Sequence, residues 1–219
     1  MTGNGMTHDA VLDRLRDARV VPVITIDDPS DGAPLARALA AGGLACVEIT
    51  FRTPRAAEAL RRICAELPEI VAGAGTVLTP AQVRTARDAG AQFIVAPGLN
   101  ARVVNECKER AIPIYPGIAT PTEIEAALEL GLETLKFFPA EPMGGLAYLK
   151  AIAAPYVDVR FMPTGGISAS NVASYLAFSR VVACGGSWMA PANWIAKGDF
   201  TAIRAETERT VAAAQGEGK

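Results

Sequence analysis

Short apolar runs alternate with amphipathic segments along almost the whole chain. The apolar runs are rich in β-branched residues and end in Gly or Pro, which is typical of strands. They predict strands at Val20–Ile26, Ala45–Phe51, Val71–Thr76, Phe93–Ala96, Ile112–Tyr115, Thr134–Phe138, Arg160–Pro163 and Val181–Cys184. Apolar residues at helical spacing predict helices at Ala33–Ala41, Pro54–Leu67, Pro80–Ala89, Ala101–Arg110, Pro121–Leu130, Gly145–Ala153, Ser170–Phe178 and Phe200–Ala214. Caps or early prolines open several of these helices, at Thr53-Pro54, Thr79-Pro80, Asn100 and Thr120-Pro121.

Eight strands that alternate with helices predict an α/β fold, a single (β/α)8 TIM barrel, with an open doubly wound sheet as the alternative. We expect one domain over residues 1–219, in which the leader 1–17 forms an N-terminal capping helix and residues 215–219 form a flexible tail. Thr25-Ile26-Asp27-Asp28 follows the first strand, where a dinucleotide-binding fold would have G-x-G-x-x-G. NAD and FAD binding are therefore disfavoured.

Composition and charge narrow the class of protein further. The 219 residues are 50% hydrophobic, and the net charge of −2 comes without a basic stripe that would hold a nucleic-acid backbone. The longest apolar stretches fall far short of the roughly 20 residues that cross a bilayer. The N-terminus does not have the pattern of a signal peptide. We therefore expect a cytoplasmic protein without a nucleic-acid or membrane partner.

The cysteines and the single histidine argue against metal or triad chemistry. Cys46, Cys64, Cys107 and Cys184 show no C-x-x-C spacing, so we expect free buried thiols rather than disulfides or metal ligands. His8 lies in the polar leader, which argues against His-based triads and zinc sites. No metal site is expected, although an all-carboxylate magnesium site stays open.

Two charged residues lie inside apolar strands. Lys136 belongs to Thr134-Leu135-Lys136-Phe137-Phe138-Pro139, and if its two neighbours face the helices, it points into the barrel. Desolvation there favours the neutral amine that attacks a carbonyl. Glu48 enters the interior by the same alternation, within reach of Lys136 for proton transfer, directly or through a water. The alternatives are a lysine that snorkels from the strand end and a structural ion pair.

Residues suited to anions follow at the strand ends. Arg52 shares the face of Glu48 and can hold a carboxylate with its planar fork, while Thr76 offers a hydroxyl beside a glycine-rich backbone. A surface ion pair for Arg52 and a helix cap for Thr76 are the alternatives.

Two Gly-Gly pairs follow the last two predicted strands. They lie in Pro163-Thr164-Gly165-Gly166-Ile167-Ser168 and in Cys184-Gly185-Gly186-Ser187, and the second opens a predicted helical segment. Barrels frequently bind phosphate with these two loops and a short helix N-terminus. The placement therefore predicts a phosphate site rather than two ordinary turns.

Taken together, these segments resemble the bacterial 2-keto-3-deoxy-6-phosphogluconate (KDPG) aldolases, which also act as 4-hydroxy-2-oxoglutarate aldolases. The matching segments cover nearly the whole chain after the leader: Val21-Pro-Val-Ile24, Val47-Glu-Ile-Thr-Phe-Arg-Thr-Pro54, Gly73-Ala-Gly-Thr-Val77, Ala96-Pro-Gly98, Tyr115-Pro-Gly-Ile-Ala-Thr-Pro121, Leu135-Lys-Phe-Phe-Pro-Ala140, Pro163-Thr-Gly-Gly-Ile-Ser168 and Cys184-Gly-Gly-Ser-Trp188. The resemblance implies a homotrimeric class I lyase of the Entner–Doudoroff route that requires no cofactor. It implies Lys136 as the Schiff-base lysine and Glu48 as the general acid/base. It also implies substrate binding by Arg52 and Thr76 at the pyruvyl carboxylate, by Phe138 in the pocket wall, and by Thr164, Gly165, Gly166, Gly186 and Ser187 toward the distal phosphate.

The expected substrate is a phosphorylated 2-oxo acid. An imine at C2 draws electrons so that the C3–C4 bond breaks once the C4 hydroxyl has lost its proton, which yields pyruvate and glyceraldehyde 3-phosphate. Cleavage of 4-hydroxy-2-oxoglutarate would give pyruvate and glyoxylate. Three other functions stay open: an aldolase for the galactonate epimer, a phosphate-binding barrel isomerase or synthase, and a barrel that only binds or assembles.

Overall fold

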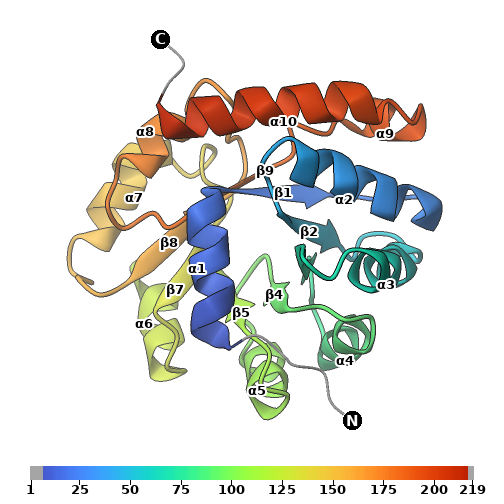
Figure 1. Cartoon of the computed structure of the whole chain (residues 1–219). Coiled ribbons are helices and arrows are strands. Elements are labelled where there is room, and N and C mark those ends of the chain that lie inside the picture. The colour runs from blue at the N-terminus through green and yellow to red at the C-terminus, as the bar shows by residue number, and fades with distance from the viewer. Residues whose placement is uncertain (1–6, 217–219) are drawn as a thin grey trace.

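The computed structural model describes residues 7–216, which form an α/β fold around a curled parallel sheet (Figure 1). The described part of the expected leader is helical from His8, and the long C-terminal helix ends at Gln215. Residues 217–219 of the expected tail and residues 1–6 of the leader lie outside the described residues.

Six parallel strands form the larger part of the sheet, in the order β5-β4-β3-β2-β1-β9. They are β1 (Val20–Ile24), β2 (Cys46–Thr50), β3 (Val71–Gly75), β4 (Phe93–Val95), β5 (Ile114–Tyr115) and β9 (Cys184–Gly186). In the register, Glu48 of β2 lies between Val23 of β1 and Gly73 of β3. Because all strands run in one direction, their carboxyl ends meet at one edge, where the loops can form a site.

Three further parallel strands follow as β6 (Gly117–Ile118), β7 (Thr134–Phe137) and β8 (Arg160–Pro163), in the order β6-β7-β8. Pro116 separates β5 from β6 because proline has no N–H for a ladder. Its carbonyl still accepts a hydrogen bond of 2.9 Å from the Lys136 amide. At the other side, isolated parallel bridges connect β8 with the β9 segment, at Phe161↔Val181 and Thr164↔Gly185.

The strand predictions were wrong in two places. The expected strand Ile112–Tyr115 begins later, at Ile114, and pairing resumes beyond Pro116 as β6, so the described residues contain nine strands instead of eight. The expected strand Val181–Cys184 is displaced, because β9 spans Cys184–Gly186. A Cβ on Gly185 would lie 2.4 Å from the Thr164 Oγ1 atom. The Gly-Gly pair therefore belongs to the strand, where it permits close approach of β8.

The helices agree more closely with the apolar periodicity. They are α1 (His8–Ala18), α2 (Gly32–Ala41), α3 (Ala56–Glu66), α4 (Pro80–Asp88), α5 (Ala101–Glu109), α6 (Pro121–Glu129), α7 (Gly145–Ala153), α8 (Val172–Leu176), α9 (Ala192–Ala196) and α10 (Phe200–Gln215). Periodicity misses α9 and the 3-10 turn η1 (Pro29–Asp31), which are too short to show it.

Local caps explain several helix starts. Thr79 and Thr120 each form a capping box with the residue three positions later, and the Asn100 side chain caps α5. Thr53-Pro54 does not open α3, contrary to the prediction. The Thr53 hydroxyl instead donates a hydrogen bond of 2.7 Å to the Ile26 carbonyl, and the helix begins at Ala56.

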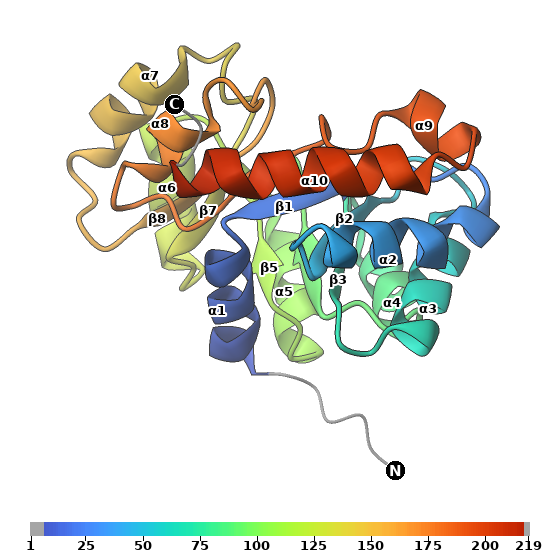
Figure 2. The same cartoon turned by 45° about the horizontal axis from the view of Figure 1, so that its top comes forward.

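The apolar side chains form two layers, one between strands and helices and one inside the curl of the sheet. Val11 and Leu15 of α1 pack with Phe93, Tyr115 and Met162 in the inner layer. Figure 1 shows α1 lying across the strands at this end. In Figure 2, α10 runs alongside α2 on the outside of the fold, and the two helices are in contact. Because α1 packs into the inner layer, it closes the curl at the amino ends of the strands, which leaves the carboxyl ends for a site.

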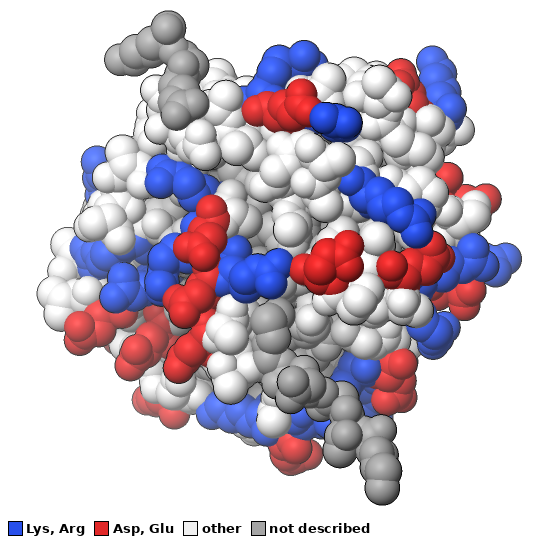
Figure 3. All heavy atoms as spheres, viewed as in Figure 1, with Lys and Arg blue, Asp and Glu red and all other residues white. Residues whose placement is uncertain are grey.

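Charged side chains of both signs are interspersed over the face seen in Figure 3. Some form exposed pairs within one helix, such as Arg62–Glu58 at 3.1 Å and Arg204–Glu208 at 2.9 Å, which contribute little to stability. This face offers no continuous basic surface of the kind that binds nucleic acid. Within residues 7–216, no helix is both long and apolar enough to cross a membrane.

Candidate active site

Lys136 of β7 and Glu48 of β2 face each other inside the curl of the sheet. The Lys136 Nζ and Glu48 Oε1 atoms are 4.0 Å apart, and the two residues are 6% and 3% exposed. Their strand neighbours pack in the outer apolar layer, as the alternation predicts. At 4.0 Å the pair is longer than a hydrogen bond, and within the described structure Glu48 Oε1 has no hydrogen-bond partner. A buried acceptor beside a buried amine is thus free to take a proton from a third group.

Glycines of β3 provide the space for this carboxylate. A Cβ on Gly75 would lie 1.9 Å from Glu48 Oε1, and a Cβ on Gly73 would lie 2.5 Å from the Phe93 ring. Larger residues at either position would displace a side chain of the interior. Gly73 and Gly75 therefore contribute to the site because they have no side chain and leave room for Glu48 and Phe93.

Burial raises the pKa of Glu48, while the positive charges of Lys136 and, to a smaller extent, Arg52 act to lower it. Burial is the largest of these influences because the carboxyl group has been removed from water. A carboxyl group with a raised pKa exchanges its proton closer to neutral pH, as a general acid/base must. The Phe138 ring lies beside the amine, with the Lys136 Nζ atom 5.0 Å from its centroid.

A cavity of about 320 Å³ opens at the carboxyl ends of the strands. Seven of the predicted site residues line it: Arg52, Phe138, Thr164, Gly165, Gly166, Gly186 and Ser187. Lys136 and Glu48 line a much smaller enclosure of about 10 Å³, and both spaces share Thr164 and Gly185. The structure therefore brings nine of the ten predicted residues to two adjoining spaces.

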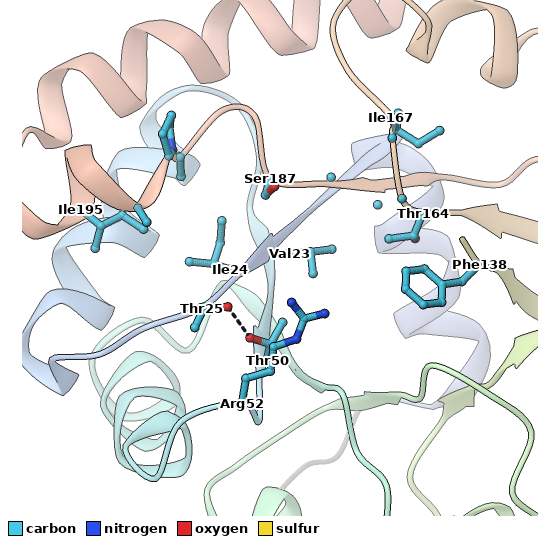
Figure 4. A pocket seen from close by; sticks show the side chains of 17 residues that line it. Val23, Ile24, Thr25, Thr50, Arg52, Phe138, Thr164, Ile167, Ser187 and Ile195 are labelled. Atoms are coloured by element: carbon cyan, nitrogen blue, oxygen red, sulfur yellow. Dashed lines mark hydrogen bonds between the residues drawn. The ribbon is translucent and has the colours of Figure 1, made fainter. Parts of the chain in front are cut away.

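The tenth residue, Thr76, does not line the cavity but is hydrogen-bonded to Arg52, which does. The Arg52 Nε atom donates a hydrogen bond of 3.2 Å to the Thr76 hydroxyl. Thr76 has a φ of 56°, in the left-handed region where a β-branched residue is strained. In Figure 4 the guanidinium of Arg52 points into the cavity, and no carboxylate of residues 7–216 forms an ion pair with it. Neither a surface ion pair for Arg52 nor a helix cap for Thr76 describes these contacts.

Two threonines of the cavity wall were not singled out as site residues. The Thr25 and Thr50 hydroxyls are 2.8 Å apart and share a hydrogen bond beside Arg52 (Figure 4). Both line the cavity, and alternation along the first two strands already contains this signal. An apolar wall completes the cavity, with Ile24, Ile167 and Ile195. No sequence pattern indicated Ile195, because α9 is too short to show periodicity.

The distal end of the cavity differs in part from the prediction. Gly165 and Gly166 have φ values of 99° and 81°, and no hydrogen bond within residues 7–216 is donated by their amides. Gly186, however, lies within β9 and pairs with Pro22. Ser187 is exposed in the cavity wall and begins a turn, closed by a hydrogen bond of 3.1 Å from the Ala190 amide. The expectation that Gly186 and Ser187 open a helix was therefore wrong, since α9 begins at Ala192.

The remaining candidate groups lie away from this cavity. All four cysteines are free, and three of them are buried, whereas Cys64 is half-buried. His8 is exposed at the start of α1. Among the described residues, no three His, Cys, Asp or Glu side chains gather to hold a metal ion.

The chain is similar to known aldolases in sequence and structure. The family model "KDPG and KHG aldolase" matches residues 11–206. A 2-dehydro-3-deoxy-phosphogluconate aldolase of Treponema pallidum is 53% identical over 201 residues, which cover 92% of this chain and 96% of that protein. Two crystal structures of KDPG aldolases superimpose over 94% of this chain. The Legionella pneumophila enzyme, with pyruvate captured at low pH as a covalent carbinolamine, has a TM-score of 0.88, 37% identity and 98% of its chain covered. The Zymomonas mobilis enzyme with 3-phosphoglycerate has a TM-score of 0.86, 42% identity and 95% of its chain covered.

The fold and these matches define the class of protein as a lyase of the aldolase type. The chain belongs to the KDPG and KHG aldolase family.

Proposed function

We propose that this chain is a class I aldolase that cleaves 2-dehydro-3-deoxy-6-phosphogluconate to pyruvate and glyceraldehyde 3-phosphate. We extend the proposal to 4-hydroxy-2-oxoglutarate, which would give pyruvate and glyoxylate. The observation that carries the proposal is the enclosed pair of Lys136 and Glu48, 4.0 Å apart beneath a cavity of substrate size. The covalent carbinolamine of the Legionella enzyme supports it as well, because such an adduct precedes an imine.

In the first half of the proposed reaction, the neutral Lys136 amine adds to the C2 carbonyl and forms a carbinolamine. The Glu48 carboxyl group donates the proton with which the carbinolamine hydroxyl leaves as water, so that a protonated imine and the Glu48 carboxylate result. The Glu48 carboxylate, directly or through a water, removes the proton of the C4 hydroxyl. The C3–C4 bond then breaks, its electrons pass to the imine nitrogen, and the C4 alkoxide becomes the aldehyde of glyceraldehyde 3-phosphate. An enamine of pyruvate remains on Lys136.

In the second half, Glu48 returns its proton to C3 of the enamine, which restores the imine. Water adds at C2 and gives one proton back to Glu48, and the resulting carbinolamine breaks down to pyruvate and the free Lys136 amine. The raised pKa of Glu48 suits a group that must both accept and donate a proton in one cycle.

The two ends of the cavity would hold the two anionic ends of the substrate. Arg52, oriented by Thr76, would bind the 2-oxo carboxylate through its planar fork. Gly165 and Gly166 offer amides without hydrogen-bond partners at the far end, and Ser187 offers a hydroxyl, which together suit a phosphate. Thr164, Gly186 and Phe138 form the wall between these ends.

We further propose that the two sheets make one closed (β/α)8 barrel, with β5 and β6 as one strand interrupted at Pro116. The bridges between β8 and the β9 segment support closure. We also propose a homotrimer, on the strength of the family resemblance alone, and a cytoplasmic location, on the sequence pattern of the N-terminus.

Borohydride reduction in the presence of pyruvate tests the proposal. Reduction of the imine would fix a pyruvyl adduct on the lysine, and peptide mass mapping should find this adduct on the Lys136 peptide. Lys136→Ala should abolish both trapping and pyruvate release from the substrate. Lys150→Ala is the matched control, because the Lys150 ammonium also lies beside a phenylalanine ring, 5.8 Å from the centroid of Phe178.

Activity that survives in Lys136→Ala, or an adduct on another lysine, would contradict the proposal. Loss of activity in EDTA would instead indicate a metal-dependent aldolase. Lys150→Ala should retain wild-type rates, since its side chain lies outside both the cavity and the enclosure.

A further inference from the structure

The peptide groups of the Thr164–Ile167 loop are held from outside the cavity. The Ala140 amide donates to the Thr164 carbonyl at 2.8 Å, and the Glu141 amide donates to the Gly165 carbonyl at 3.0 Å. In a planar trans peptide the N–H points opposite to the carbonyl of the same group. These two bonds therefore fix the directions of the Gly165 and Gly166 N–H groups. These N–H groups are the proposed hydrogen-bond donors to the substrate phosphate.

The Glu141 side chain is fixed in turn by a buried tyrosine. The Tyr175 hydroxyl donates a hydrogen bond to the Glu141 carboxylate, and Tyr175 is 1% exposed. The side chain of Glu141 packs under the loop, so closely that a Cβ on Gly166 would lie 2.5 Å from the Glu141 Cβ atom. Tyr175 lies on α8, which packs against β9. The end of β9 leads directly into Ser187, the other proposed contact of the phosphate. Neither Glu141 nor Tyr175 is among the described residues that line the cavity.

Glu141 also follows the strand that carries the lysine. It lies five residues after Lys136, in a turn that is closed by a hydrogen bond of 3.0 Å from the Gly145 amide to the Ala140 carbonyl. The Glu141–Tyr175 contact thus connects the turn after β7 with α8, while the Glu141 amide connects the same turn with the loop after β8. Asn171 holds the other side of that loop, because its side-chain amide donates to the Gly166 carbonyl at 3.0 Å.

We propose that Glu141 and Tyr175 are positioning residues for the substrate phosphate, because their hydrogen bond fixes the backbone that orients the Gly165 and Gly166 amides. The inference rests on the proposed function, in which these amides bind the phosphate. Loss of the contact should weaken binding of phosphorylated substrate while the imine chemistry at Lys136 continues.

The test compares Tyr175→Phe and Glu141→Gln with wild type on two substrates, one phosphorylated (2-dehydro-3-deoxy-6-phosphogluconate) and one not (4-hydroxy-2-oxoglutarate). Tyr175→Phe should raise KM for the phosphorylated substrate by roughly 3- to 30-fold, the range of coupling through residues that do not touch the ligand. The KM for 4-hydroxy-2-oxoglutarate and the borohydride trapping of pyruvate should stay near wild-type values. Inhibition by inorganic phosphate, measured with 4-hydroxy-2-oxoglutarate as the substrate, should weaken in parallel.

Tyr156→Phe is the matched control, because the Tyr156 hydroxyl donates to the Glu125 carboxylate at 2.8 Å, away from the loop. It removes the same kind of hydrogen bond and should leave both KM values unchanged. The double variant Glu141→Gln/Tyr175→Phe should lose no more than the worse single variant, since the two residues act through one contact.

Equal losses on both substrates, or the same KM change in Tyr156→Phe, would overturn the proposal. So would unchanged KM and phosphate inhibition in a folded Tyr175→Phe protein. Glu141→Gln changes an exposed residue, so it provides the test if the buried substitution fails to fold. A wild-type protein that releases no pyruvate from either substrate would refute the proposed function instead.

Discussion

Replacing Gly75 by alanine tests whether the position of the Glu48 carboxylate governs catalysis. The added Cβ would lie 1.9 Å from Glu48 Oε1 and 2.6 Å from Cδ, whereas real Cβ contacts stay above 3.0 Å. The carboxylate must therefore retreat by about 1 Å, and a misplacement of that size can cost roughly 10²-fold in rate. We expect kcat of Gly75→Ala to fall by roughly this factor. Imine formation should continue because Lys136 keeps its place.

The assay follows pyruvate release from 2-dehydro-3-deoxy-6-phosphogluconate, with borohydride trapping of pyruvate as a separate measure of imine formation. Gly98→Ala is the control, since a Cβ at Gly98 meets nothing within 4 Å. Both variants should be compared with wild type in thermal unfolding, so that a lost rate is not mistaken for a lost fold. A wild-type kcat in Gly75→Ala would refute the reasoning, because Glu48 would then tolerate displacement without a cost in rate.

Three further predictions concern the general acid/base, the two anion sites and one helix cap. Glu48→Gln should lower turnover by roughly 10²–10⁴-fold and still permit slow trapping of the imine by borohydride. Glu48 loses its basic form as pH falls through its pKa, and burial raises that pKa above 4.5, the usual value for glutamic acid. The acidic limb of wild-type kcat/KM should therefore lie above pH 4.5, and a limb below that pH would contradict this role. Ser187→Ala should cost about 1–2 kcal/mol in kcat/KM for the phosphorylated substrate and less for 4-hydroxy-2-oxoglutarate, whereas Arg52→Ala should lower kcat/KM for both substrates. Equal losses for Ser187→Ala on the two substrates would show that Ser187 does not bind the phosphate. Thr120→Ala should lower the free energy of unfolding by about 1 kcal/mol through loss of its capping box, measured in urea; an unchanged value would mean that packing alone starts α6.

The reactive pair illustrates how much the sequence can predict. Lys136 and Glu48 stand out because a charged residue within an apolar strand has a direction set by the two-residue period of the strand. Their burial follows that rule. The distance between them depends on the register of strands far apart in the chain, as does the lack of any hydrogen bond to Glu48 Oε1 within residues 7–216.

The last predicted strand, Val181–Cys184, shows where sequence reasoning fails. Glycines usually end a strand, so the Gly-Gly pair after Cys184 predicts a loop. In the structure Gly185 remains in β9, because its missing side chain lets Thr164 approach. A rule for single residues cannot include this contact, since the partner lies on another strand.

The sequence by itself determined the alternation of strands and helices, the buried lysine and glutamate, and the family resemblance, because each of these depends on local periodicity or on a short motif. The tertiary structure alone decided which glycine makes room for Glu48, which threonines meet at the cavity wall, and how Glu141 and Tyr175 hold the Gly165–Gly166 loop. These are contacts between residues remote in sequence, and their distances are set by strand register and helix packing, which no local pattern specifies.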